Sequence, residues 1–396
     1  MLILMLTVFM TGVSGSGFVR MAQAQSTNTY TDVDTADLVG HGTDSTPYEI
    51  SNVSELQAME DGLTANYELV GDIDASNTAQ WNDGRGFDPV GSSSDQFAGS
   101  LDGNNHTITG LTIDRQYEDN SRRRVGLFGY SFGTITDVAL TEVTVTGNEY
   151  AGGLVGLSTG GTIRNVTVSG KVRSTVTAGG LAGQNFRGAI QNATASVNVT
   201  SDNTAGGLVG FNSGSIRNAR ASGSVAGDNT VGGLVGSNRG IIRDTFAVGN
   251  VTGNQETGGL VGRNNDETGT VEQSYFDTQA SGQDPSGGSA IRLTILIFGP
   301  TNSAIGLTTG EMQGSAASEN MSGLKFGENW QTVSGGYPEL IALSDPDSDF
   351  DSDSADGTPK PESTTTSSEI PTFPNVGIIS FVSIMTAILH RLQSST

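Results

Sequence analysis

A glycine-rich motif recurs through the middle of this 396-residue chain at an almost constant interval. Each copy is a pair of glycines, a leucine, a valine or alanine, and another glycine, as in residues 152–156. The leucines begin with the related Gly126-Leu127-Phe128-Gly129 and are spaced by 27, 27, 27, 26 and 26 residues: Leu127, Leu154, Leu181, Leu208, Leu234 and Leu260. This regularity predicts a solenoid, because each unit can bury its apolar side only against its neighbours.

The residues between the motifs favour strands over helices. An isoleucine stands two residues after a glycine in each unit: Ile135, Ile163, Ile190, Ile216 and Ile242. Short β-branched stretches such as 166–168 alternate as half-buried strands do. Each glycine inside a helix would cost about 1 kcal/mol, which opposes a helical solenoid. A propeller blade needs about 40 residues, which is longer than the repeat. We therefore predict an all-β parallel solenoid with three short strands in each coil of about 27 residues, bent at glycine.

Two polar columns recur with the same period. The fourth residue after the motif leucine is polar in every unit: Ser131, Ser158, Asn185, Asn212, Asn238 and Asn264. The second column comprises Asp137, Asn165, Asn192, Asn218 and Asp244. Stacked coils lie about 4.8 Å apart, so we interpret both columns as amide ladders that fix the bends. The alternative, a row of amides that binds a ligand, lacks aromatic or charged partners.

Composition restricts the partners and the compartment. The formal net charge of −23 opposes binding to nucleic acid and to anionic membrane surfaces. The three lysines are Lys171, Lys325 and Lys360, and an acidic, lysine-poor surface resembles that of haloarchaeal proteins. The absence of cysteine from the sequence excludes disulfides, thiolate nucleophiles and cysteine metal sites.

The N-terminal end predicts export. Residues 1–13 are mostly apolar, and the small-x-small triplet Ala22-Gln23-Ala24 precedes a polar stretch. We expect residues 1–24 to be a signal peptide and the mature chain to begin at Gln25. The alternative is a buried N-terminal strand.

The C-terminal end predicts a stalk and an attachment segment. Residues 344–370 are rich in Asp, Ser, Thr and Pro and predict a disordered stalk. Residues 371–396 contain a short apolar run, Val376 to Leu389, which is below the roughly 20 residues of a robust membrane span. This layout resembles archaeal C-terminal sorting signals, although Pro371-Thr372-Phe373-Pro374 stands where that family has Pro-Gly-Phe. We expect a membrane-anchoring or sorting segment that forms a short apolar helix.

The repeat resembles the GLUG family, which is named for the Gly-Leu-hydrophobic-Gly core present here as residues 153–156. Similarity extends over about residues 41–343 and includes Ser274-Tyr275-Phe276-Asp277, Trp330 and Tyr337-Pro338. The resemblance implies a right-handed β-helix on extracellular proteins, many of them similar to adhesins and some attached to peptidase regions, with no catalytic set in the repeats. An apolar insert, Ile291 to Pro300, departs from the family pattern.

These features define the expected domain organisation. We predict an N-terminal cap and first coils over residues 25–125, the repeat solenoid over 126–276, and a C-terminal cap region with the apolar insert over 277–343. Divergent segments at the two ends are suited to covering open coil edges.

Candidate chemical groups are sparse. The three histidines are His41, His106 and His390, and no hydrolase, metalloprotease or phosphate-loop motif occurs in the sequence. Acidic residues of the N-terminal coils are candidates for a glycosidase-like carboxylate cluster beside Trp81: Asp72, Asp74, Asp83, Asp88, Asp102 and Asp114. Most stand beside Gly or Asn, where Asp makes turns. The alternate-Asp run 345–353 lacks the glycine and glutamate of a calcium loop.

Glycosylation sequons occur at seven positions, Asn52, Asn105, Asn165, Asn192, Asn198, Asn250 and Asn320. Two of them, Asn165 and Asn192, are also ladder positions, and a buried ladder amide cannot carry a glycan.

The sequence therefore predicts a noncatalytic extracellular surface protein, adhesin-like or envelope-associated, with no catalytic, metal or cofactor site. The expected partner is a surface ligand, cell-envelope component or polysaccharide, with membrane contact through the C-terminal segment and no nucleic acid. The alternatives are a secreted carbohydrate-active β-helix enzyme, of lyase or hydrolase type, and the accessory region of a surface peptidase.

Overall fold

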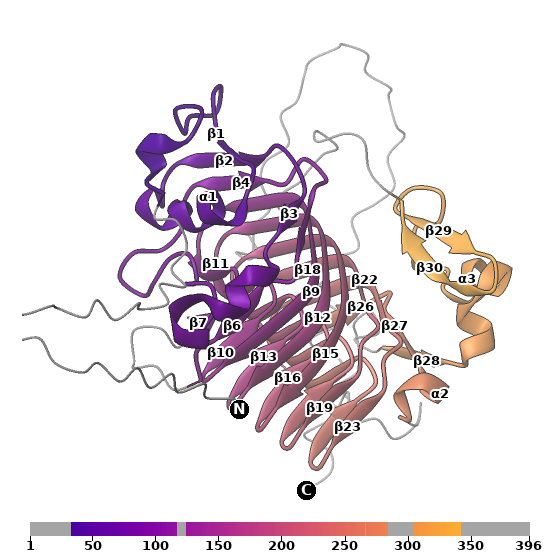
Figure 1. Ribbon diagram of the computed structural model, residues 1–396. Helices are drawn as coiled ribbons and strands as arrows, with labels where there is room; N and C mark the ends of the chain where they lie inside the picture. The colour runs from indigo at the N-terminus through magenta and orange to yellow at the C-terminus, as the bar shows by residue number, and fades with distance from the viewer. Residues whose placement is uncertain (1–32, 117–123, 266, 284–303, 342–396) are drawn as a thin grey trace, which may run out of the picture. The chain divides into compact units, whose positions relative to one another are not determined.

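Three parallel sheets run along a stack of coils in the computed structural model, which describes residues 33–116, 124–265, 267–283 and 304–341 (Figure 1). Sheet 1 follows the path β1(Tyr48–Ile50), β2(Asn66–Leu69), β4(Ser100–Asp102), β9(Thr134–Gly147), β12(Thr162–Ser174), β15(Ala189–Ser201), β18(Ser215–Ala221), β22(Ile241–Ala247), β27(Tyr275–Asp277) and β28(Ile305–Leu307). Six short strands pair beside this path: β3(Ile73–Asp74), β5(Thr107–Thr109), β6(Thr112–Asp114), β19(Val225–Gly227), β23(Val251–Gly253) and β26(Thr270–Glu272).

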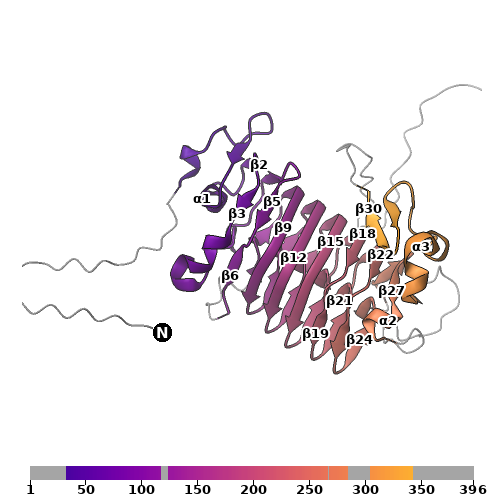
Figure 2. The ribbon, with the colours of Figure 1, turned by 45° about the vertical axis from the view of Figure 1, so that its right-hand side comes forward.

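Sheets 2 and 3 contain six strands each. Sheet 2 comprises β7(Arg124–Val125), β10(Tyr150–Gly152), β13(Thr177–Gly179), β16(Thr204–Gly206), β20(Thr230–Gly232) and β24(Glu256–Gly258). Sheet 3 comprises β8(Phe128–Ser131), β11(Val155–Thr159), β14(Ala182–Phe186), β17(Val209–Asn212), β21(Val235–Asn238) and β25(Val261–Asn264). The chain passes from sheet 1 to sheet 2 to sheet 3 in each coil, so the predicted parallel solenoid with three strands per coil is confirmed (Figure 2).

Successive coils pair in register. β12 and β15 are parallel and place Ile163 against Ile190, and β15 and β18 place Ile190 against Ile216. The same side chain therefore recurs at the same place in each coil. The six motif leucines are fully buried, and each contributes about 1.5–3 kcal/mol by leaving water.

The motif glycines stand where two backbones meet at the corner between sheets 2 and 3. A Cβ on Gly206 would lie 2.0 Å from the Val209 carbonyl oxygen and 2.6 Å from the Gly236 backbone nitrogen of the next coil. On Gly179 and Gly232 it would lie 2.0 and 1.9 Å from a carbonyl oxygen. No side chain fits at these positions, so the motif requires glycine to bring the corner together.

Both predicted amide ladders are present. In the first, Nδ2 of each of Asn185, Asn212 and Asn238 donates to Oδ1 of the asparagine in the next coil, at 2.7–2.9 Å. In the second ladder the direction is reversed. Nδ2 of each of Asn165, Asn192 and Asn218 donates to Oδ1 of the ladder residue in the preceding coil, at 2.8–3.1 Å.

The second ladder forms the bend in sheet 1. Its five residues, Asp137, Asn165, Asn192, Asn218 and Asp244, all have φ between 49° and 58°. Asn and Asp tolerate this left-handed conformation better than other residues with side chains. The bend divides sheet 1 into a first half, which precedes the ladder residue in each coil, and a second half, which follows it.

The N-terminal segment joins the stack before the first motif. Tyr67 of β2 pairs with Tyr48 and with Leu101, and Leu101 pairs with Ile135. The helices of this segment are η1(Thr35–Asp37), α1(Val53–Gln57), η2(Ala58–Asp61) and η3(Ser76–Gly84). Residues 48–102 therefore supply coil-like strands of sheet 1 as well as covering helices.

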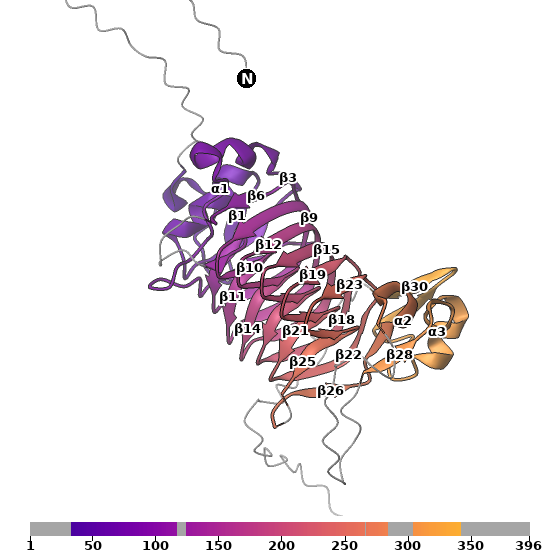
Figure 3. The same cartoon turned by 90° about the horizontal axis from the view of Figure 1, so that it is seen from below.

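The C-terminal segment lies against the outer side of the last coils (Figure 3). It contains η5(Thr309–Met312), α3(Gly314–Asn320) and the antiparallel pair β29(Trp330–Val333) and β30(Gly336–Leu340), and it follows α2(Thr278–Ser281). Buried Trp330 packs on Phe246, with ring centroids 5.1 Å apart, and Arg220 Nη1 donates to the Pro338 carbonyl oxygen at 3.1 Å. These contacts place the segment on the second half of sheet 1.

A partly buried hydrogen bond stabilises this docking. The Tyr337 hydroxyl donates to Asp277 Oδ2 at 2.6 Å, while Asp277 Oδ1 accepts from the backbone N–H groups of Gln279 and Ala280 at the start of α2. Burial, together with this hydrogen bond, raises the pKa of Tyr337 to about 12. The hydroxyl therefore remains a donor at ordinary pH.

Several expectations lie outside the described residues. They are the signal peptide, residues 1–24; the apolar insert, Ile291 to Pro300; the stalk, residues 344–370; and the attachment segment, residues 371–396.

The corner glycines generate a stability prediction. We expect Gly206→Ala to lower the free energy of unfolding by about 2 kcal/mol or more, because the new methyl group collides with two backbones. Gly71→Ala is the matched control, since a Cβ there meets nothing within 4 Å. Urea denaturation followed by circular dichroism measures both, and equal effects of the two substitutions would contradict the role assigned to the corner.

The end of the second ladder generates a prediction with a pH dependence. Asp244 cannot donate to Asn218, and in the described chain Oδ1 of each is buried without a hydrogen-bond partner. Burial raises the pKa of the Asp244 carboxyl above its usual 3.8, although Arg217, Arg243 and Lys325 offset part of the effect. A raised pKa in the folded state means that stability falls as pH rises through the unfolded-state value and levels off above the folded-state value.

We therefore expect Asp244→Asn to raise the free energy of unfolding at pH 7 by about 1 kcal/mol, because the new amide can donate to Asn218. The gain should shrink as pH is lowered toward the acid range, because the raised pKa lets the native Asp244 carboxyl take up a proton. Denaturation at several pH values and one ionic strength measures it. A variant less stable than the native protein at pH 7 would show that the neighbouring cations outweigh the cost of burial.

Candidate binding surface

The carboxylates proposed as a catalytic cluster make separate local contacts. Asp72 accepts from the Thr107 backbone N–H at 2.8 Å, Asp74 from that of Ser76 at 2.9 Å, and Asp102 from that of Asn104 at 2.8 Å. The bonds of Asp74 and Asp102 stabilise turns, as Asp commonly does. The bond of Asp72 joins two neighbouring coils.

The remaining candidates are also engaged locally. Asp83 has φ of 58° within η3, and Asp114 lies 3.4 Å from the amide nitrogen of Gln116. Trp81, proposed as an aromatic wall, is 4% exposed and stacks on Phe87 in the core. The structure does not assemble the predicted carboxylate groove beside Trp81.

Electrostatics also disfavour an acid catalyst here. The hydrogen bond from the Thr107 backbone lowers the pKa of Asp72, and His106 adds to the effect. The hydroxyl and backbone N–H of Ser76 lower the pKa of Asp74. A general acid needs a raised pKa, so both carboxylates are suited to accepting hydrogen bonds.

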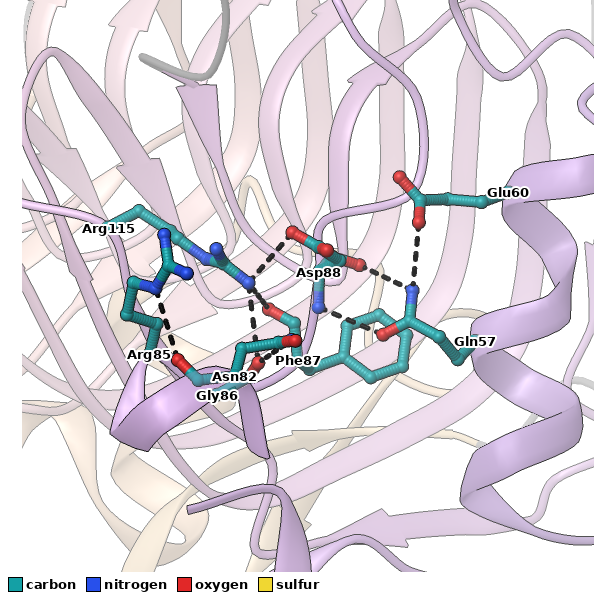
Figure 4. A network of polar contacts seen from close by, with 8 residues as sticks. All are labelled: Gln57, Glu60, Asn82, Arg85, Gly86, Phe87, Asp88 and Arg115. Atoms are coloured by element: carbon teal, nitrogen blue, oxygen red, sulfur yellow. Dashed lines mark hydrogen bonds and ion pairs between the residues drawn. The ribbon is translucent and has the colours of Figure 1, made fainter. Parts of the chain in front are cut away.

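Asp88 belongs to a buried polar network (Figure 4). Arg115, whose side chain is 2% exposed, forms an ion pair with Asp88 at 2.8 Å, and its Nη2 also donates to the carbonyl oxygens of Gly86 and Phe87. Gln57 Oε1, at the end of α1, accepts from the Asp88 backbone N–H at 2.9 Å, and Gln57 Nε2 donates to the Asp88 carbonyl oxygen at 3.0 Å. The network ties α1 and loop 86–88 to the first coils.

The two histidines of the described ranges, His41 and His106, have no cluster of metal ligands around them, and His390 lies outside the described residues. His106 Nδ1 lies 3.3 Å from Asp72 Oδ1, and both side chains are partly exposed. His41 is exposed in the turn before β1. Within the four described ranges, no three His, Asp or Glu side chains converge as a metal site requires.

Two sequons coincide with ladder residues in the structure. Asn192 is 7% exposed, and both Asn165 and Asn192 use their side-chain amides in the second ladder. The sequon residues Asn52, Asn105, Asn198, Asn250 and Asn320 are exposed.

A column of long polar side chains runs along the first half of sheet 1. Strand register places Arg164 beside Gln191, Gln191 beside Arg217, and Arg217 beside Arg243. Arg217 is exposed, and Arg243 forms an ion pair with Glu272 at 2.7 Å. These side chains point outward, because the preceding residues, Ile163, Ile190, Ile216 and Ile242, are buried.

Arginine and phenylalanine meet at the adjacent corner, where the chain turns from sheet 3 into sheet 1. The Arg187 guanidinium lies 5.0 Å from the centre of the Phe186 ring, and that of Arg239 lies 5.4 Å from the Phe211 ring. Phe186 is 38% exposed, and Phe132 at the same corner is 57% exposed. Stacking on a ring orients a guanidinium while leaving its N–H edges toward solvent.

We call Arg164, Arg187, Arg217, Arg239 and Arg243, with Phe186 and Phe211, the arginine face. Sequence reasoning missed it and wrongly stated that the polar columns lack aromatic or charged partners. Arg217 directly precedes Asn218, and Phe186 directly follows Asn185. The available signal was the recurrence of arginine one residue before the ladder residue, at Arg164, Arg217 and Arg243.

Comparison with known proteins agrees with the coil geometry. The model of the GLUG motif matches three successive segments, residues 147–173, 174–200 and 201–226. These coils are GLUG repeats. Each matched segment spans one circuit of sheets 1, 2 and 3, with the Gly-Gly-Leu core at the glycine corner.

Two relatives are similar to about a third of the chain. Halomucin of Haloquadratum walsbyi is 41% identical over 158 residues, which are 37% of this chain and 2% of halomucin. A protein named as a proposed Gly-rich membrane protein of Evansella cellulosilytica is 36% identical over 137 residues, 33% of this chain and 15% of that protein. The chain thus spans a small fraction of either relative.

A solved structure shares the fold. The crystal structure of a proposed immunoglobulin A1 protease from Bacteroides ovatus superposes with a TM-score of 0.58 and 22% identity, covering 78% of this chain and 96% of that chain. At this identity the likeness concerns the fold alone. Every helix in the described ranges is too short or too polar to cross a membrane.

The Arg115 network generates a prediction about stability. We expect Arg115→Ala to lower the free energy of unfolding by about 3 kcal/mol, because it leaves Asp88 without its counter-ion inside the protein. Arg85→Ala is the control, since Arg85 is exposed in the same network and should cost less than about 1 kcal/mol. A stable Arg115 variant would contradict the structural role.

Proposed function

We propose that this chain is a noncatalytic protein of the cell surface that binds an extracellular partner through the side of its solenoid. The observation that carries the proposal is the arginine face, where outward side chains repeat from coil to coil on a rigid parallel scaffold. Binding residues on a rigid scaffold lose little conformational freedom when a partner docks. An adhesin-like or envelope role is the function that uses such a surface.

The relatives support the surface location. The Evansella protein is named as a membrane protein, and the other relative bears the name halomucin. We extend this location to the present chain, with export through residues 1–24 and attachment through residues 371–396.

Cell fractionation tests the location. A strain expressing the chain with an epitope tag inserted in residues 344–370 should yield the protein with the envelope, and intact mass should place its first residue near Gln25. Recovery inside the cell with Met1 retained would contradict export and attachment together. A deletion strain tests adhesion, because loss of attachment to cells or matrix is expected, and normal attachment counts against an adhesin.

Catalysis is the second candidate, because the Bacteroides ovatus neighbour is named as a protease and β-helices also carry polysaccharide-cleaving enzymes. Incubation of the purified chain with casein, immunoglobulin A1 and polygalacturonate tests both chemistries. We expect no new peptides and no new reducing ends. Cleavage that is abolished by Asp72→Asn or His106→Gln would overturn the noncatalytic proposal.

A further inference from the structure

Charged residues gather at two corners of the GLUG coils. Acidic residues gather where sheet 1 turns into sheet 2, at Glu149, Asp202, Asp228 and Glu256. Three of them form ion pairs there, with Arg124, Arg173 and Arg263. The arginine face lies at the other end of sheet 1, where the chain enters from sheet 3. A chain with a net charge of −23 therefore keeps a local basic surface.

Three guanidinium groups of this face are open to a partner. Arg187, Arg217 and Arg239 are exposed, and none of them forms an ion pair within the described ranges. Of the nearby carboxylates, Glu272 pairs with Arg243, and Asp137 accepts a hydrogen bond in the second ladder. Buried Asp244 interacts with Arg217, and exposed Glu267 stands at the same corner of the coil that follows Arg239. Arg187 and Arg239 thus keep guanidinium groups that form no ion pair within the described ranges, while the charge of Arg217 is balanced in part by Asp244.

The spacing of the arginines follows the coils. Arg164 and Arg217 are separated by the Gln191 coil, and Arg187 and Arg239 by the coil of Ser213. Coils lie about 4.8 Å apart, so Arg217 and Arg243 of adjacent coils are separated by about 4.8 Å, while Arg164 and Arg217, like Arg187 and Arg239, are separated by about 9.6 Å. The longer interval is comparable to the length of two sugar residues in an extended glycan, and the intervening Gln191 and Ser213 offer hydrogen bonds between the charges.

We propose that the arginine face binds a linear acidic polysaccharide whose carboxylates are presented along an extended chain. Guanidinium groups bind carboxylates through paired N–H groups. The rings of Phe186 and Phe211 offer apolar faces for the C–H side of a sugar, while already orienting Arg187 and Arg239. The inference rests on the proposed binding function and names its ligand class.

Charge density separates this ligand from nucleic acid. Each DNA strand carries a phosphate about every 3.4 Å, which is denser than about one arginine per coil of about 4.8 Å. The summed field of a strongly acidic chain also repels such a polymer. A uronate chain carries fewer charges per unit length and presents sugar faces to the rings.

Fluorescence anisotropy of labelled polygalacturonate oligomers with the full-length protein tests the proposal. We expect saturable binding that weakens as salt is added. The variant Arg187→Gln/Arg217→Gln/Arg239→Gln should bind at least about tenfold more weakly, a loss of about 1.4 kcal/mol. Phe186→Ala should also weaken binding, by a few-fold.

A charge-matched control removes three cations from other surfaces. Arg85→Gln/Lys171→Gln/Arg173→Gln should bind as the native protein does, because these exposed residues lie outside the arginine face. Equal losses in the two triple variants would show a general charge effect and overturn the proposal. Thermal unfolding of each variant checks that the fold is retained.

Binding tests with other polymers identify the chemical class of the ligand. Neutral dextran should not compete with polygalacturonate, and a single-stranded DNA of equal length should bind at least about tenfold more weakly. Equal or tighter binding of DNA, or no binding of polygalacturonate by the native protein, would overturn the acidic-polysaccharide assignment. If polygalacturonate does not bind but a deletion strain still loses attachment, the ligand class is wrong and the surface-binding function is retained. Failure of the ligand assignment is therefore distinguishable from failure of the proposed function.

Discussion

The close approach of two backbones at the corner between sheets 2 and 3 is the constraint on which the rest of the structure depends. Glycines such as Gly179, Gly206 and Gly232 leave no room for a Cβ there. The chain can therefore turn from one sheet to the next within a few residues and return in register one coil later. Constant coil length then stacks one leucine on the next and gives a narrow, continuous core.

The same periodicity offsets the cost of burying polar side chains, because each ladder amide forms a hydrogen bond with the equivalent amide of the neighbouring coil. The two ladders run in opposite directions, and this polarity explains the behaviour of their ends. Asp137 begins the second ladder and needs only to accept, which a carboxylate does well. Asp244 stands where a donor is required, so it is mismatched to Asn218, and its carboxyl has a raised pKa.

Regular stacking also carries the functional argument. A side chain that points outward in one coil has an equivalent in the next, so modest groups such as a single arginine become an extended surface. Nonrepeating residues attach the terminal segments at the two ends of the stack. Arg115 and Asp88 join the N-terminal loop to the first coils, and Trp330 and Tyr337 attach the C-terminal segment to the last ones.

The sequence by itself determined the coil length, the parallel stack, the buried leucines and both ladders, because a repeat of fixed period forces equivalent residues into equivalent places. The proximity of the Arg187 corner to the Arg217 column was decided by the tertiary structure, since it depends on where the chain turns from sheet 3 into sheet 1. Tertiary structure also decided that the candidate Asp residues make separate contacts and that Asp88 meets Arg115. Such contacts join segments without a repeat, and no periodic signal in the sequence connects them. Side-on docking of the C-terminal segment follows the same logic, because it depends on the outward faces of Phe246 and Arg220, which only the folded coils place together.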